Sequence, residues 1–523
     1  MNTPLFNMNP HLEKTNDNAE LKAIIFYIST RINLNPIPLM PNTLLNQYFK
    51  LHPVGQGFFY TCTIKSPNAV KPFRFVFDCG SLNKKNAEVE VDQYLRHNFP
   101  SVEKTLDLLI ISHFDEDHIN FLPRLLKEVQ VKKIIAPFIS LEERLVLALR
   151  AKAYQKRGKA NEMDDQTLTD ILDPNSLLRY LGNEGELILV ESDPDPTPFG
   201  IEEETDFKPG RDINQSEITF GFPLNQVISQ KKHKDARGTK EQKRVKDSHK
   251  GSVAINDISI MDFLFYRKQI GTADTAFFKK VYELFIQHHA MEFKEPEKPT
   301  IDEIISAVKK VSSAKEVKDL FKKAAKTIKG ISINVSDLTD MNTTALCLLH
   351  HNPKALYRNL RNAARPKKIL AHFQFAGIAK NNSVGSNVEE NTLNKTWHEN
   401  FEIESPYNSL QVPNTLLTSD SFLLKEKDVD AFKKRYEYYW NQFWLFQIPH
   451  HGAERNADQT LLKLIPAHAF GFINYGIQKT WGGIWRHPSP KLLENLMRTD
   501  IQLAFLRINE NAGLEFDYSI FQD

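Results

Sequence analysis

The chain has 523 residues, of which 41% are hydrophobic and 25% are charged, proportions that are typical of a soluble globular protein. Its formal net charge of +2 argues against a polyanionic or polycationic partner for the whole surface, so contact with nucleic acid would need a local patch. The three cysteines are widely spaced, which excludes a disulfide scaffold and a cysteine-based zinc knuckle and predicts a reducing, cytoplasmic location. No segment is typical of a signal peptide or a membrane span, and we predict neither.

The first 139 residues predict an N-terminal extension followed by the first half of an α/β core. Residues 1–48 are polar, contain one apolar segment at 21–28 and carry no motif. Residues 49–139 form the first half of the core and open with strands separated by a glycine turn. A later apolar run predicts a buried strand that ends at Asp78, and we expect the backbone to turn tightly at Gly80. For Asp78 alone, the alternative is an ordinary polar residue at a strand end.

The polar loop at residues 112–118 is the feature from which the function is inferred. The unbroken apolar run 108–111 predicts a strand buried on both faces, and an amphipathic helical pattern begins after the loop. Open α/β sheets place their chemistry at the carboxyl ends of strands, where this loop lies. The loop carries two imidazoles and two carboxylates, on His113, Asp115, Asp117 and His118.

These four side chains predict a metal centre. Histidine together with carboxylate is a ligand set suited to zinc, manganese or iron. Four such groups exceed what one open catalytic ion usually takes from a single loop, so we expect two adjacent ions. The alternative is a solvated acidic turn that contains two histidines by chance.

Residues 140–332 are interpreted as long helical and charged insertions into the core. Within them, residues 272–329 have the period and the lysine content of amphipathic helices. Residues 230–250 are the most basic part and have no apolar face and no aromatic residue. They predict either a solvated, partly disordered loop or an arm that follows phosphates, and they do not favour a platform for base stacking.

Residues 333–523 predict the second half of the core, with a further insertion at about 352–410. Strands in this half end in polar residues, because Asp420 closes one apolar run and His450 and His451 close another. Neighbouring side chains of an extended segment point in opposite directions, so we expect only one of these histidines, His450 in preference to His451, to face the metals. The other polar positions of interest in this half are Asn342, Arg486 and His487.

Five short motifs follow one another along the chain: Asp-x-Gly at 78–80, His-x-Asp-x-Asp-His at 113–118, Leu-Leu-Thr-Ser-Asp at 416–420, His-His-Gly at 450–452 and His-Pro-Ser at 487–489. This series resembles the metallo-β-lactamase superfamily. Asp115 stands where the common signature has histidine, and this pattern is similar to that of the ComEC-like branch, named after a DNA-uptake protein. The resemblance implies an α/β fold, the αββα metallo-β-lactamase sandwich with long helical and charged insertions, and a binuclear metal-dependent hydrolase.

The resemblance also implies roles for individual residues. Asp78 would support the metal loop, Asp420 would bridge two ions, and His450 or His451 would assist the leaving group. Asn342 stands where other members carry a metal-binding histidine. The implied catalytic residues are Asp117, His450 and His451, and the implied metal ligands are His113, Asp115, Asp117, His118, Asp420 and His487, with Asp78, Gly80 and Asn342 in support and Arg486, in place of a glycine, as a phosphate contact.

The implied cofactors are two divalent ions, zinc or manganese, and the carboxylate that replaces a histidine moves the preference toward manganese or magnesium. ComEC-like motifs favour a phosphodiester, so we predict a phosphodiesterase or nuclease that acts on nucleic acid or a nucleotide. Stand-alone members resemble effectors of bacterial anti-phage defence, which predicts a sensor or ATPase partner bound through the insertions, and no membrane partner. The alternatives are a cyclic-nucleotide, small-ester or lactone hydrolase and a partner-regulated module with little activity alone.

Overall fold

A computed structural model of the chain describes most of the segments on which these predictions depend. Arg486 and the apolar segment at 21–28 lie outside the described residues. The described residues are 43–67, 69–100, 104–155, 165–192, 198–199, 217–222, 227–235, 238–245, 250–255, 258–311, 313–328, 341–353, 356, 369–379, 394–403, 414–454, 456–457, 459–466, 469–476, 487–497 and 504–522.

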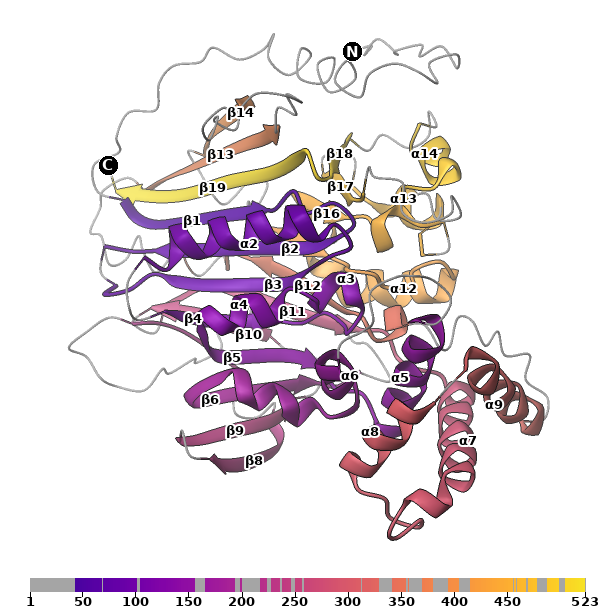
Figure 1. Ribbon diagram of the computed structural model, residues 1–523. Coiled ribbons are helices and arrows are strands. Elements are labelled where there is room, and N and C mark those ends of the chain that lie inside the picture. The colour runs from indigo at the N-terminus through magenta and orange to yellow at the C-terminus, as the bar shows by residue number, and fades with distance from the viewer. Residues whose placement is uncertain are drawn as a thin grey trace, which may run out of the picture.

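Two β-sheets form the centre of the described part of the molecule (Figure 1). The first has the order β14-β13-β19-β1-β2-β3-β4-β5-β6-β9-β8, and the second has the order β18-β17-β16-β15-β12-β11-β10-β7. The strands of the first sheet are β1 (Thr43–Leu51), β2 (Gly57–Lys65), β3 (Phe73–Ser81), β4 (Thr105–Ile110), β5 (Gln130–Pro137), β6 (Leu181–Val190), β8 (Val227–Asp235), β9 (Gly238–Val245), β13 (Ile369–Ala379), β14 (Asn394–Ile403) and β19 (Ala512–Gln522). Those of the second are β7 (Ile218–Gly221), β10 (Lys250–Ile255), β11 (Ile258–Arg267), β12 (Leu346–His351), β15 (Thr415–Leu417), β16 (Leu445–Gln447), β17 (Phe470–Asn474) and β18 (Ala504–Ile508).

Each sheet contains a run of parallel strands, and these runs set the position of the polar loops. In the first sheet, β3, β4, β5 and β6 are parallel neighbours, and in the second sheet β15, β16, β17 and β18 are parallel neighbours. The strands β3 and β4 are almost entirely buried, as expected for parallel strands that are covered on both faces. Because parallel neighbours end at the same edge of a sheet, the residues that follow β3 and β4 lie side by side.

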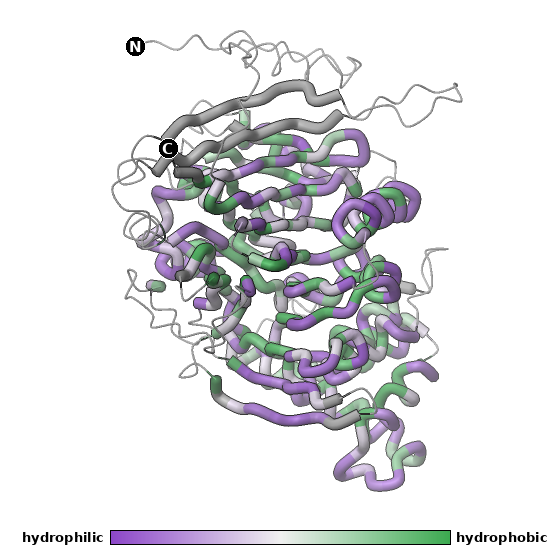
Figure 2. The backbone as a smooth tube through the Cα atoms, turned by 90° about the vertical axis from the view of Figure 1, so that its left-hand side faces the viewer, coloured by the Kyte–Doolittle hydropathy of each residue, from purple (hydrophilic) through white to green (hydrophobic). Residues whose placement is uncertain are grey.

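The two sheets pack face to face, and helices cover their outer faces. Phe75 of β3 and Phe263 of β11 meet between the sheets, with ring centroids 5.2 Å apart. Along the helices the tube in Figure 2 alternates between hydrophilic and hydrophobic colours, as expected for helices that bury one face. The helices on the outer side of the first sheet are α2 (Lys84–Asn98), α4 (Leu122–Glu128), α5 (Leu141–Gln155) and α6 (Asp165–Leu172), and those on the second are α12 (Glu426–Arg435), α13 (Gln459–Leu464) and α14 (Pro490–Leu496). Helices α7 (Thr272–His288), α8 (Ile301–Lys310) and α9 (Ala314–Thr327) pack on α5 and α6 (Figure 1).

The architecture confirms the predicted α/β class and differs from the predicted extent of the insertions. Strands β6 to β11, all within residues 140–332, extend both sheets, and helices α5 to α9 are the α-helices described in this region. Strands β13 and β14 come from the segment at about 352–410 and join the first sheet, and β1 begins at Thr43, inside the predicted N-terminal extension. None of the helices in the described ranges combines the length and the apolar character that crossing a bilayer requires.

The basic segment at 230–250 contributes strands, so its interpretation as a loop is wrong. Residues of β8 and β9 form an antiparallel pair at the edge of the first sheet. Part of the positive charge is neutralised across neighbouring strands, because Glu186 of β6 accepts from Lys133 at 2.8 Å and from Lys243 at 2.6 Å. Opposite charges on adjacent strands stabilise the strand pairing. The composition of the segment alone does not reveal these partners.

Acidification is expected to destabilise the fold through His350, a buried residue of β12. Its Nε2 atom accepts a hydrogen bond from the Tyr60 hydroxyl at 2.8 Å, and its ring stacks on Phe49 at 5.1 Å. Burial and the neighbouring His351 lower the pKa of His350 from 6.5 to about 3. Below pH 6.5 the unfolded chain therefore binds a proton that the folded chain does not, and stability falls as the pH falls toward the folded-state pKa.

This histidine should account for about 2 kcal/mol of the unfolding free energy lost between about pH 6.5 and about pH 5. The measurement is urea unfolding at several pH values for the native chain and for His350→Gln, which has no titrating group at this position. His97→Ala, at an exposed position of α2, is the control. The same acid-induced loss in all three proteins would contradict this assignment.

Candidate metal centre

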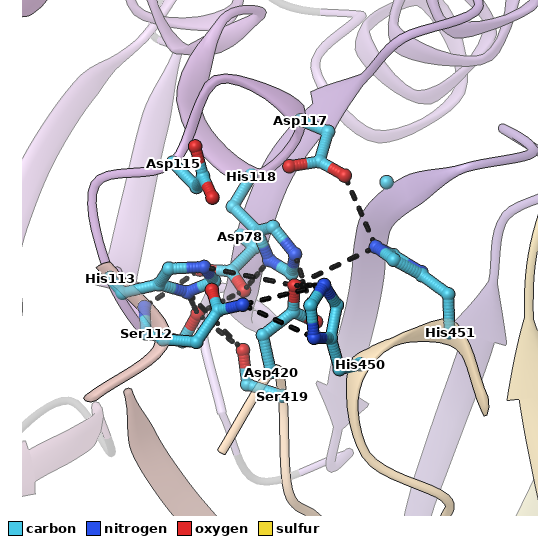
Figure 3. Close-up of polar contacts among 12 residues, drawn as sticks. Asp78, Ser112, His113, Asp115, Asp117, His118, Ser419, Asp420, His450 and His451 are labelled. Atoms are coloured by element: carbon cyan, nitrogen blue, oxygen red, sulfur yellow. Dashed lines mark hydrogen bonds and ion pairs between the residues drawn. The ribbon is translucent and has the colours of Figure 1, made fainter. Parts of the chain in front are cut away.

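Polar side chains from both sheets converge at the carboxyl ends of the parallel strands (Figure 3). Asp78 lies near the end of β3, and His113 to His118 follow β4. Asp420 follows β15, and the histidine pair at 450–451 follows β16. The two sheets meet directly at this point, because the Ser419 hydroxyl donates to the Ser112 hydroxyl at 2.7 Å.

Asp78 holds the loop after β4 in place. Its carboxylate accepts from the backbone N–H of Ser112 at 2.7 Å, from the Ser112 hydroxyl at 2.5 Å and from His118 Nδ1 at 2.8 Å. Burial raises the pKa of Asp78, while the hydrogen bonds from His118 and Ser112 oppose that shift. With Nδ1 engaged, the Nε2 atom of His118 faces Asp420, and a carboxylate bonded to the far nitrogen is how proteins commonly orient a metal-binding histidine.

His113 and His118 present ring nitrogens to the same buried space. The Nδ1 atom of His113 lies 2.9 Å from the Ser112 hydroxyl, and its Nε2 lies 4.0 Å from Asp420 Oδ2. Burial and the nearby His118 lower the pKa of His113 to about 3, so this ring is neutral at physiological pH and keeps a lone pair. For His118, the charges of Asp420 and Asp78 outweigh burial and raise the pKa.

Three buried atoms of this group lack a hydrogen bond within the described ranges: His113 Nε2, His118 Nε2 and Asp420 Oδ1. The last two lie 3.3 Å apart, but their orientation does not meet hydrogen-bond geometry. Buried polar atoms are rarely left unsatisfied, because each one costs about 1–3 kcal/mol. Two imidazole nitrogens and a carboxylate oxygen facing one space are suitable ligands for a divalent transition ion.

Asp117 and His451 form a second pair next to the first. Asp117 Oδ2 lies 3.1 Å from His451 Nε2, and His451 Nδ1 lies 2.8 Å from the backbone carbonyl oxygen of Asn474. Although burial alone would raise it, the hydrogen bond from His451 and the charge of His118 lower the pKa of Asp117 to about 2. Ligand atoms of Asp117, His118 and His451 all lie within 4.8 Å of one another, and so do those of Asp78, His113 and His118.

Asp420 is the central carboxylate of the site. Its oxygens lie 3.3 Å from His118 Nε2, 4.0 Å from His113 Nε2, and 3.7 Å from the Nε2 atoms of both His450 and His451. Burial alone would raise the pKa of Asp420, but His451, His118 and His450 hold it well below the ordinary value. The carboxylate therefore stays charged, and it lies between the group that contains His113 and the group that contains His451.

The expectation that only one histidine of the pair faces the site is wrong. His450 and His451 have φ angles of 48° and 51°, so they form a left-handed turn rather than an extended segment, and both rings reach Asp420. The side chain of His450 is 23% exposed and that of His451 is 1% exposed, which leaves His450 accessible to a substrate. Its Nδ1 donates to Asn456 Oδ1 at 2.5 Å, and Asn342 Nδ2 lies against the ring, 3.2 Å from Nδ1 and 3.3 Å from Nε2.

Besides Asp420, two predicted ligands lie outside both ligand groups. Asp115 is the N-cap of α3 (Glu116–Ile119) and accepts from the Glu116 backbone N–H at 3.1 Å. His487 lies beside the histidine pair, with its ring centroid 5.5 Å from that of His450 and 6.2 Å from that of His451. Burial and the two neighbouring imidazoles lower the pKa of His487 to about 3, so its ring is neutral and suited to bind a cation.

Gly80 serves a different purpose from the tight turn that was predicted. Its φ angle is not in the left-handed region. A Cβ atom there would lie 2.5 Å from the carbonyl carbons of both Asp117 and His118, so the absence of a side chain lets the backbone of α3 press against β3. Gly57 of β2 completes this contact, because a Cβ there would lie 2.6 Å from the Asp117 carbonyl oxygen.

The residues that orient the ligands were not predicted from the sequence. These are Ser112, Ser419, Asn456 and Asn474. Two of them had a local signal, since Ser112 and Ser419 each directly precede a predicted ligand. The asparagines had none, because neither stands next to a predicted ligand in the sequence. No known protein-family model matches the chain, and a search of curated proteins finds no match.

Proposed function

We propose that this chain is a two-metal hydrolase with the αββα metallo-β-lactamase architecture, and that its substrate is a phosphodiester. The observation that carries the proposal is the position of Asp420, a charged, buried carboxylate with four imidazole nitrogens within 4.0 Å. A carboxylate in that position can offset the repulsion between two cations held close together. The order of the sequence motifs supports the same architecture.

In this proposal the two ligand groups share Asp420. His113 lies on one side of it, Asp117 and His451 lie on the other, and His118 is within reach of both. Asp115 and His487 lie outside these groups, and their roles as ligands stay predictions. When bound, two divalent ions would supply Lewis acidity that neutralises the charge of a phosphodiester and activates water.

The side chains around the centre have different roles in the proposed reaction. His451 is buried and hydrogen-bonded to Asp117 and to the Asn474 backbone, so it holds the Asp117 carboxylate in position. His450 is the exposed member of the pair, and its ring is fixed by Asn456 and Asn342. We assign it the transfer of a proton to the leaving oxygen, because a general acid must be within reach of the substrate and held in one orientation.

The phosphodiester class follows from the ComEC-like sequence motifs. The candidates are DNA, RNA and a cyclic nucleotide, with other esters and lactones as weaker alternatives. The role in anti-phage defence, the sensor or ATPase partner and the cytoplasmic location stay predictions from the sequence.

The test is hydrolysis by the full chain, stripped of metal and then supplied with Mn²⁺, Zn²⁺ or Mg²⁺. Labelled single- and double-stranded DNA, RNA and cyclic dinucleotides are the substrates, and bound metal is measured in parallel. Asp117→Asn should lower the rate on the cleaved substrate at least about 100-fold, because it removes a charge that both orients His451 and contacts the centre. Asp430→Asn, at an exposed position of α12, is the control. A chain that binds both ions and cleaves none of these substrates would overturn the phosphodiester assignment.

A further inference from the structure

A second cluster of ligand-type side chains lies between helices α7 and α9. His288 is the last residue of α7, His289 is the cap that follows, and Glu316 lies in the first turn of α9. Ligand atoms of the three residues lie within 4.8 Å of one another. Helices α7 and α9 lie side by side (Figure 1). Farther along them, the rings of Phe277 and Phe321 are 6.0 Å apart. These residues belong to none of the sequence motifs and to no part of the proposed hydrolase centre.

His289 is oriented as a metal ligand would be. Its Nδ1 atom lies 2.8 Å from Glu292 Oε1, and the other oxygen of Glu292 accepts from Lys310 at 2.6 Å. This carboxylate favours the tautomer with the proton on Nδ1 and leaves the lone pair of Nε2 directed away from it. The His289 residue is 7% exposed, and within the described ranges its Nε2 has no hydrogen-bond partner. Buried imidazole nitrogens without a hydrogen-bond partner are rare, and a bound metal ion would satisfy this one.

The distances among the three groups suit a metal ion better than a salt bridge. Glu316 Oε1 lies 3.7 Å from His288 Nε2 and 4.0 Å from His289 Nε2, both too long for hydrogen bonds. With bonds of about 2.0–2.1 Å, neighbouring ligands of a tetrahedral zinc ion lie about 3.4 Å apart. Small movements of two side chains would reach that spacing. The two imidazole planes are at 87° to each other, which keeps the rings from overlapping as both approach one point.

We propose that His288, His289 and Glu316 bind one zinc ion that joins the end of α7 to the start of α9. Two imidazoles and one carboxylate are a zinc ligand set that leaves a coordination position open. A cavity of about 320 Å³ adjoins the cluster and is lined largely by apolar side chains, Leu149, Leu284, Phe285, Val311, Val317 and Leu320. The open position therefore has room for water or a small anionic ligand. The His288 side chain is 65% exposed, so the ion can enter from solvent.

The test is a zinc titration of the metal-free full chain by calorimetry, carried out in an Asp420→Asn background that weakens the hydrolase centre. One zinc equivalent should remain in this background. His288→Ala and Glu316→Gln should each weaken its binding at least about 100-fold. His288 is exposed, so its replacement leaves the core intact, and circular dichroism checks the fold of both variants. Asp319→Asn, on the same helix and lining the same cavity, is the matched control and should leave the binding unchanged.

Cobalt(II) supplies a second readout that does not depend on hydrolysis. Cobalt bound to two imidazoles and a carboxylate in a tetrahedral arrangement should give intense visible absorption, which His288→Ala should remove and Asp319→Asn should preserve. If the two ligand variants bind the same number of zinc equivalents with the same affinity as the parent chain, the site does not exist and the cluster is only a helix cap. Because the proposed hydrolase activity is not measured, failure of one proposal leaves the other standing.

Discussion

Replacing Asp420 with asparagine should lower the hydrolytic rate by at least about 10³-fold, equivalent to about 4 kcal/mol of activation free energy. It should also lower the metal bound at this centre from two ions to fewer than one, while the zinc ion proposed between α7 and α9 stays bound. The carboxylate lies within 4.0 Å of Nε2 atoms on four histidines. An amide of the same size has no charge to offset the repulsion between two cations. Its NH₂ group would also direct hydrogens toward nitrogens that the cations need.

Metal content by mass spectrometry and initial rates on the cleaved substrate measure the two effects together. Asp430→Asn makes the same chemical change at an exposed position of α12 and should keep the metal content and rate of the native chain. An Asp420→Asn protein that retained both ions would show that the carboxylate does not bridge them. If the native chain cleaves none of the tested substrates but Asp420→Asn still loses the ions, the result supports the metal centre and leaves the substrate unidentified.

That polar side chains gather at one site was predictable from the sequence, because these side chains follow the ends of predicted strands. Asp78, His113 and Asp420 each follow an apolar run, and parallel neighbours bring the ends of such runs to one edge. The two halves of the chain meet at this edge, as the contact between Ser112 and Ser419 shows.

The direction of individual side chains was not predictable in the same way. His450 and His451 both face Asp420 because two consecutive residues have positive φ angles, a conformation that non-glycine residues rarely adopt. Asp115 caps a short helix, which a pattern of alternating aspartates does not distinguish from metal binding. In each case the local backbone, rather than the residue type, sets the contact.

The regions predicted as insertions contain further features that could not be predicted from the sequence. Charged strands such as β8 and β9 have no apolar period to reveal them, and their stability depends on partners such as Glu186 that lie elsewhere in the sequence. The cluster of His288, His289 and Glu316 was invisible for the same reason, since it forms only when two helices pack together. Long-range pairing decides both features, and a single sequence does not record it.

Gly80→Ala should destabilise the fold by about 3 kcal/mol and weaken metal binding at least about 100-fold. The added methyl group would lie 2.5 Å from carbonyl carbons of Asp117 and His118. The backbone cannot easily move away, because Asn120 accepts from the Ser81 N–H at 2.9 Å and donates to the Ser81 carbonyl at 2.8 Å. The clash must therefore displace the segment that carries two of the ligands or break these bonds.

Urea unfolding and metal titration of the same preparations separate the two consequences. Gly182→Ala is the matched control, since the nearest atom to its added methyl group is the end of the flexible Gln130 side chain, at 3.2 Å. This control should lose little stability and bind metal as the native chain does. If Gly80→Ala matched it in both measurements, the loop would have enough freedom to accept a methyl group, and the position of Asp117 and His118 would depend on Asp78 and Asp420 rather than on the contact between α3 and β3.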